Sequence, residues 1–173
     1  METQKLKPES YPSHFAGYIK LVVNEDLNSV LKDQIETSKQ FFNSIPEEKT
    51  DYRYAEGKWN IKEVLQHIID TERIFTYRAL AFARKEISAL PNMDENNYAE
   101  NSHANSRTWK DLIEEFEAVR HATIYLYESF SEDQLELTGK TVSYEMSVKA
   151  VGYIIAGHSA HHINILKERY LTD

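Results

Sequence analysis

Apolar residues recur every three or four positions along four long stretches of the chain. This is the period of an α-helix that buries one face. The pattern predicts helices over residues 24–45, 60–84, 108–130 and 147–170. The first helix should end at Pro46, because proline cannot continue a helix. The sequence therefore predicts an all-α fold, a four-helix bundle in which each helix turns one apolar stripe inward.

Residues that commonly cap helices precede three of these stretches. Asn60 with Glu63 forms a capping pair at the second helix, Thr108 or Ser106 caps the third, and Ser147 caps the fourth. Such side chains accept a hydrogen bond from backbone N–H groups that the first helical turn leaves without a partner. They indicate where the helices begin.

The connections between the predicted helices are unequal. Residues 46–59 join the first two helices, whereas the polar stretch 85–107 separates the second from the third. A connection of that length can cross the bundle and make consecutive helices parallel, which gives an up-down-down-up order. Residues 137–144 predict a small hairpin that turns at Gly139-Lys140. The segment 10–23, which is rich in Tyr and Phe, is expected to pack across one end of the bundle.

Composition narrows the classes of function that the chain can have. The chain has 173 residues, 41% of them apolar, which suits a single domain over residues 1–173 with one core. A net charge of -8 offers no basic surface, so nucleic acid is not an expected partner. The apolar runs are far shorter than the roughly 20 residues that span a bilayer. The first ten residues contain no apolar signal segment, so we expect no membrane association and a cytoplasmic location.

The chain contains no cysteine, which excludes disulfides and thiolate ligands. Histidine and carboxylate side chains are then the strong metal ligands available. Any thiol that takes part in a reaction must come from another molecule.

Two of the seven histidines have a spacing typical of metal ligands. His158 and His162 lie four residues apart on the inward stripe of the last helix, about 6 Å along the axis and about 40° around it. His161 points to the other side of His158, so we expect it beside the site. His67 lies roughly 10 Å from the start of the second helix. Its depth matches that of the pair best if the two helices are antiparallel, which agrees with an up-down-down-up order.

A lone histidine on an apolar face is more often a hydrogen-bonded core residue, and HxxxH also occurs by chance. The third inward histidine, on another helix, favours a metal site over this interpretation. A carboxylate-bridged di-iron bundle would need two Glu-x-x-His motifs, which the chain lacks. An iron oxygenase site, with two histidines and a carboxylate, is not needed to explain the pattern, because three histidines are already placed to bind an ion.

Two segments resemble the DinB-like superfamily, in particular the group that includes bacillithiol transferases. They are residues 58–84, KWNIKEVLQHIIDTERIFTYRALAFAR, and residues 156–171, AGHSAHHINILKERYL. The positions that match the second helix of that family are Trp59, Glu63, His67, Asp70, Glu72, Arg73 and Arg78. The resemblance implies that His67, His158 and His162 bind the metal, that the bundle has up-down-down-up topology, and that a homodimer forms.

Three neutral imidazoles with a fourth position open are typical of a catalytic metal site. Zinc or nickel is the expected ion, with iron and manganese as further candidates. Such an ion can activate water for hydrolysis or a thiol for transfer. The resemblance favours transfer, that is, a thiol-dependent S-transferase that acts on a small molecule with a low-molecular-weight thiol as cosubstrate. A metal-dependent hydrolase and a non-catalytic dimeric interaction module are the alternatives.

Supporting roles are predicted for several neighbours of the site. Asp70 is placed to accept the ring N–H of His67, as carboxylates behind metal-bound histidines do. His161 should lie behind the site, and Trp59 should form a wall of the pocket. Arg78, about 16 Å along the helix from His67, is expected to pair with a buried acid. The connection 85–107 is the expected source of substrate selectivity.

Overall fold

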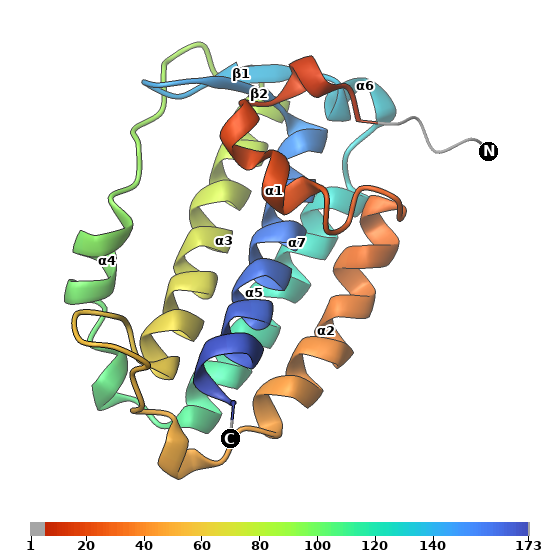
Figure 1. Cartoon of the computed structure of the whole chain (residues 1–173). Helices are drawn as coiled ribbons and strands as arrows, with labels where there is room; N and C mark the ends of the chain where they lie inside the picture. The colour runs from red at the N-terminus through yellow and green to blue at the C-terminus, as the bar shows by residue number, and fades with distance from the viewer. Residues whose placement is uncertain (1–5, 173) are drawn as a thin grey trace.

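A computed structural model of the protein describes residues 6–172. Four long helices form the molecule: α2 (Leu27–Asn43), α3 (Ile61–Ala83), α5 (Trp109–Glu128) and α7 (Val148–Ile165), as Figure 1 shows. A π-helical turn, Leu166–Tyr170, continues α7. The predicted four-helix bundle is confirmed. No helix in residues 6–172 is both long enough and apolar enough to cross a membrane.

The helices follow the up-down-down-up order. In Figure 1 the chain descends through α2, ascends through α3, descends again through the long connection, ascends through α5 and descends through α7. The connection therefore travels the length of the bundle and leaves α3 and α5 parallel. Helices α3 and α7 are antiparallel neighbours, which is the arrangement that the depths of the histidines favoured.

Capping side chains define the helix starts. The side chain of Asp26 accepts from the backbone N–H of Ser29, so α2 begins three residues later than predicted. Asn60 and Glu63 form a reciprocal capping box at α3. Thr108, rather than Ser106, caps α5, and Ser147 caps α7.

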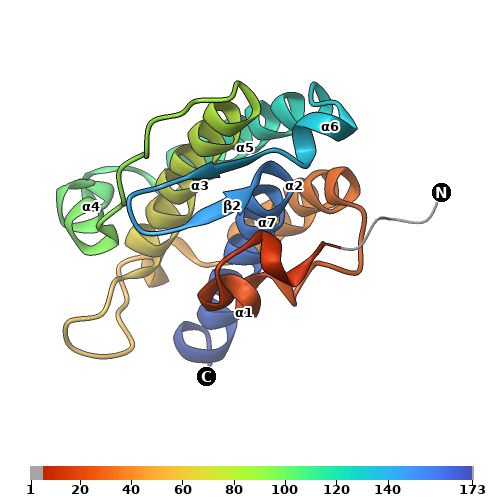
Figure 2. The same ribbon diagram turned by 90° about the horizontal axis from the view of Figure 1, so that it is seen from above.

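The predicted hairpin is present, but the position of its turn was predicted wrongly. Strands β1 (Thr138–Lys140) and β2 (Glu145–Ser147) are antiparallel, and Gly139 pairs with Met146 inside the ladder. Residues 141–144 form the turn instead. The glycine is needed for packing, because a Cβ atom at position 139 would lie 1.9 Å from Cδ1 of Phe82. The hairpin thus lies against α3, and Figure 2 shows it crossing one end of the bundle.

Two short helices lie in segments for which no helix was predicted. The long connection contains α4 (Glu95–Asn101), capped by Asp94, and a 3-10 turn, Ala104–Ser106. After α5 the chain forms α6 (Glu132–Leu135), which starts with a capping box of Ser131 and Gln134. These helices span few turns, so they are too short to produce a recognisable hydrophobic periodicity in the sequence.

The N-terminal segment packs along α7 and reaches the hairpin end of the bundle. Two 3-10 turns, Pro8–Ser10 and Ser13–Phe15, lead into α1 (Ala16–Ile19). Helix α1 lies beside α7 in both ribbon views (Figures 1 and 2). Gly157 permits this contact, because a Cβ atom there would lie 2.2 Å from the carbonyl oxygen of Tyr18.

The core has two apolar clusters, one near each end of the bundle. The cluster at the hairpin end includes Phe82 and Ile154, and the other includes Phe42 and Leu65. Buried polar residues separate them. The guanidinium of Arg120 donates to both carboxylate oxygens of Glu72, at 2.8 and 2.9 Å, and to Oε1 of Gln34 at 2.7 Å. Nε2 of Gln34 donates to the carbonyl oxygen of Ala156. This network, Glu72–Arg120–Gln34–Ala156, ties all four helices together.

Candidate metal centre

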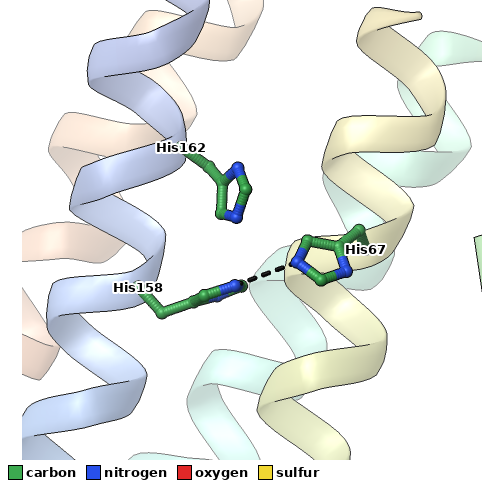
Figure 3. A group of neighbouring side chains, drawn as sticks. All are labelled: His67, His158 and His162. Atoms are coloured by element: carbon green, nitrogen blue, oxygen red, sulfur yellow. Dashed lines mark hydrogen bonds between the residues drawn. The ribbon is translucent and has the colours of Figure 1, made fainter. Parts of the chain in front are cut away.

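Three histidines meet between α3 and α7. His67 projects from α3, and His158 and His162 project from α7 toward it (Figure 3). The Nε2 atoms of His67 and His158 are 3.0 Å apart. One nitrogen from each of the three rings lies within 4.8 Å of the other two. The structure therefore brings together the three residues that the sequence selected as metal ligands.

The helical repeat and the antiparallel arrangement of α3 and α7 place these rings. His158 and His162 follow each other at i and i+4, so both face α3. His67 faces them from the level where the apolar cluster of Leu65 gives way to the polar network of Glu72. His67 and His158 are buried, and His162 is partly exposed at the cavity described below.

Burial keeps these imidazoles neutral. It lowers the pKa of His67 to about 4 and the pKa of His162 to about 3, the latter with help from neighbouring histidines. Burial, followed by repulsion from His162 and His67, holds the pKa of His158 well below its usual range. At pH 7 each ring therefore keeps a nitrogen lone pair, which is the form that binds a metal.

The donor set fits a divalent ion. Nitrogens bound tetrahedrally to one zinc ion at about 2.0–2.1 Å lie roughly 3.3 Å from one another. The 3.0 Å separation between His67 and His158 is close to this value, and the 4.8 Å limit for the set requires only a small ring movement. The group contains three imidazoles and no carboxylate, so the remaining position would be open to the cavity.

Thr71 takes the place predicted for Asp70. The hydroxyl oxygen of Thr71 lies 3.5 Å from Nδ1 of His67, on the side of the ring away from the other histidines. The carboxylate of Asp70 instead accepts a hydrogen bond from Nε2 of Gln66 at 2.9 Å, and burial raises the pKa of Asp70. Thr71 is four residues after His67, so the helical spacing carried a signal that the sequence analysis missed.

Aromatic side chains surround the histidines. The ring of Trp59 lies 4.7 Å from that of His67, which places Trp59 at the site, as expected of a pocket wall. The ring of His161 lies beside that of His162, at 5.2 Å. Tyr18 contacts His158 and His161, with ring centroids 5.4 and 5.0 Å away. The contribution of Tyr18 was not predicted, because nothing in the sequence pairs α1 with α7.

The three histidines line a cavity of about 480 Å³. The N-terminal segment closes one side of the cavity with Tyr18, and the hairpin contributes Tyr144. The long connection contributes Met93 and Glu95. A second cavity, of about 250 Å³, shares Trp59 and His162 with the first. The histidine site is thus accessible from two hollows.

Arg78 also lines the larger cavity. The prediction that it pairs with a buried acid was wrong. Its guanidinium donates to the hydroxyl of Tyr144 at 3.0 Å and to the carbonyl oxygen of Pro91 at 2.9 Å. It takes part in none of the ion pairs in residues 6–172. The buried acid on α3, Glu72, pairs with Arg120 on the adjacent helix instead.

The sequence matches a known family. The family model of the DinB superfamily matches residues 31–166, so the chain belongs to the DinB superfamily. A protein of Oceanobacillus iheyensis named "Putative metal-dependent hydrolase OB0413" is 26% identical over 151 residues. That match covers 84% of this chain and 86% of the relative.

A solved structure has the same fold. YfiT from Bacillus subtilis, described as "a probable metal-dependent hydrolase with an unusual four-helix bundle topology", superposes with a TM-score of 0.74. The match covers 95% of this chain and 91% of that one, at 18% sequence identity. At that identity the likeness establishes the shared architecture.

Proposed function

We propose that the protein is a divalent-metal-dependent enzyme that transfers a low-molecular-weight thiol to a small molecule. The observation that carries the proposal is the convergence of three neutral imidazoles at the wall of a cavity. Zinc or nickel is the proposed ion, with iron and manganese as further candidates, because imidazole ligation suits all except manganese well.

The residues of the chain would prepare the site for such an ion. His67, His158 and His162 would hold it through ring nitrogens, and Thr71 would orient the ring of His67 from behind. Trp59 and Tyr18 would exclude bulk water from two sides. When bound, the ion would supply a Lewis-acid position that lowers the pKa of a water molecule or a thiol.

The two cavities at the site support thiol transfer. The chain has no cysteine, so a thiol that reacts at the site must arrive as a second substrate. The two cavities that meet at Trp59 and His162 give separate space for a thiol and an acceptor. Hydrolysis is the second candidate, and the names of both relatives favour it.

The first experiment measures metal content by elemental mass spectrometry on protein purified without an affinity tag. The parent should contain about one equivalent of a divalent metal, and His158→Ala should lose it. His121→Ala is the matched control, because His121 is exposed on α5, outside the site. No metal in the parent, even after reconstitution with zinc, nickel, iron and manganese, would favour the non-catalytic interaction module.

The second experiment separates transfer from hydrolysis. Metal-loaded protein is incubated with 1-chloro-2,4-dinitrobenzene and either cysteine or glutathione, and separately with p-nitrophenyl acetate alone. Thiol-dependent release of chloride that is lost in His158→Ala supports transfer. Ester cleavage without thiol, lost in the same variant, supports hydrolysis instead.

A further inference from the structure

Arg78 is a buried cation in the cavity wall, and it has no acidic partner among residues 6–172. Arg78 is only 2% exposed, yet its side chain borders the 480 Å³ cavity. Its hydrogen-bond partners in the described chain are the hydroxyl of Tyr144 and the carbonyl oxygen of Pro91. A guanidinium has five N–H groups, so these two acceptors leave donors available.

Arg120 shows how the same bundle treats a buried arginine that has a structural role. Arg120 is fully buried, and Glu72 binds it through two hydrogen bonds. That pairing offsets the loss of hydration of both charges. Arg78 lacks an equivalent, and two neutral acceptors do not balance its charge. A buried cation beside an open cavity is suited to an anion that enters from solution.

We propose that Arg78 binds a carboxylate group of the substrate, which makes small carboxylic acids the substrate class of this site. The planar guanidinium matches a carboxylate in shape and can donate two parallel hydrogen bonds to it. Tyr144 and Pro91 would hold the guanidinium in place for this contact. Anion binding stands on Arg78 and the cavity alone; the claim that the anion belongs to a substrate rests on the proposed function.

The position of Arg78 sets the size of the ligand. It follows His67 by eleven residues on α3, about 16 Å along the helix axis. Helical side chains lean toward the N-terminus, and the guanidinium carbon of Arg78 indeed lies 4.8 Å from the ring centre of Phe75, one turn earlier. The carboxylate would therefore bind at the Arg78 end of the cavity, with the reacting group roughly 10 Å away near the histidines.

The charges around the cavity favour a carboxylate over a phosphate. One guanidinium faces this space, and Glu95 contributes an acidic side chain to the same cavity. The chain as a whole carries a net charge of -8. A singly charged carboxylate matches one cation, whereas a phosphate monoester carries close to two negative charges near pH 7. At the Arg78 end of the cavity one guanidinium would have to balance both charges, because the proposed ion would lie roughly 10 Å away at the histidines.

Isothermal titration calorimetry on the full-length protein tests the proposal with 4-phenylbutyrate and its neutral amide. The parent should bind the acid at least ten times more tightly than the amide. Arg78→Gln should weaken binding of the acid at least tenfold and leave binding of the amide unchanged. Arg84→Gln is the matched control, because Arg84 ends the same helix outside the cavity, and it should bind as the parent does.

A second variant separates binding from a structural role. Arg78→Lys keeps the positive charge but loses the planar pair of donors, so its preference for acid over amide should lie between those of the parent and Arg78→Gln. If Arg78→Gln does not fold, as judged by circular dichroism, the parent and Arg78→Lys decide the question. Equal affinities for acid and amide would overturn the proposal, as would tighter binding of 3-phenylpropylphosphonate. Both results are independent of the metal content, and the measurement of metal content tests the proposed function separately.

Discussion

At the scale of single residues, the side chain behind a metal ligand tunes the site. The hydroxyl oxygen of Thr71 lies 3.5 Å from Nδ1 of His67, whereas the carboxylate of Asp70 bonds to Gln66. Thr71→Val removes the hydroxyl but keeps the shape of the side chain. We expect about a tenfold loss of zinc affinity, because partners of metal-bound histidines contribute roughly 10- to 100-fold. Competition with a chromogenic chelator measures the loss.

Asp70→Asn is the control for this prediction. It changes the carboxylate that the sequence analysis placed behind His67, and it should leave zinc affinity within about twofold of the parent. A large loss in Asp70→Asn together with none in Thr71→Val would restore the original assignment. It would mean that the ring of His67 turns toward Asp70 when the ion binds.

The neutral histidines should also make metal-free protein sensitive to acid. The pKa of His67 is about 4 when folded, below its ordinary value near 6.5. As the pH falls from 6.5 toward 4, the unfolded chain binds a proton at this residue and the folded chain does not. The free energy of unfolding therefore falls with pH. His67 alone should account for about 2 kcal/mol between pH 7 and pH 5.

Urea denaturation of chelator-treated protein at the two pH values checks this. His67→Gln removes the titrating group, so its loss of stability between pH 7 and pH 5 should be smaller than that of the parent by about 1–2 kcal/mol. Comparison of the two proteins cancels the contribution of the carboxylates. The same loss in both proteins would show that His67 is already protonated when folded at pH 5.

The sequence predicted which histidines meet, but it did not predict several of the residues around them. His158 and His162 share a helix, so their convergence follows from the helical repeat, and His67 follows from matched depth. Tyr18 and the partners of Arg78 depend on which separate segments meet. One sequence carries no periodic signal for contacts of that kind.

At the scale of elements, the ends of the long helices were predicted to within a few residues because their caps are encoded locally. Asn60 and Ser147 each accept a hydrogen bond from a backbone N–H in the first turn, as expected. The hairpin turn was misplaced because Gly139 was interpreted as a turn residue. Position 139 requires glycine because the ring of Phe82 lies against it, and this is a contact between distant segments.

The packing of α1 on α7 yields a prediction about Gly157. A methyl group there would lie 2.2 Å from the carbonyl oxygen of Tyr18, a backbone atom that cannot rotate away. Gly157→Ala should therefore displace α1 and cost about 1–3 kcal/mol in the free energy of unfolding, as overpacked sites do. Urea denaturation measures this cost.

Gly17→Ala is the matched control on the other helix of this contact. A Cβ atom at position 17 meets nothing within 4 Å, so this variant should be unchanged or up to about 1 kcal/mol more stable. If Gly157→Ala is as stable as the parent, α1 can shift without loss, and its role as a wall of the cavity would need revision.

At the scale of the whole molecule, the three histidines of the candidate metal site lie where the apolar core is interrupted. The two apolar clusters meet at the network of Glu72, Arg120 and Gln34. Gln34 extends this network to the carbonyl oxygen of Ala156, two residues before His158. The same interruption leaves room for buried histidines and joins the helices that carry them.

Replacement of the buried ion pair tests how far this network stabilises the bundle. Arg120→Met leaves the carboxylate of Glu72 buried without its partner, so the free energy of unfolding should fall by about 3–5 kcal/mol. Glu72→Met/Arg120→Met removes both charges and should recover most of that loss. Urea denaturation of the parent, both single variants and the double variant gives the coupling energy, which should be about 2 kcal/mol or more. Additive effects would show that the pair contributes no specific interaction, and that α3 and α5 are aligned by their apolar clusters alone.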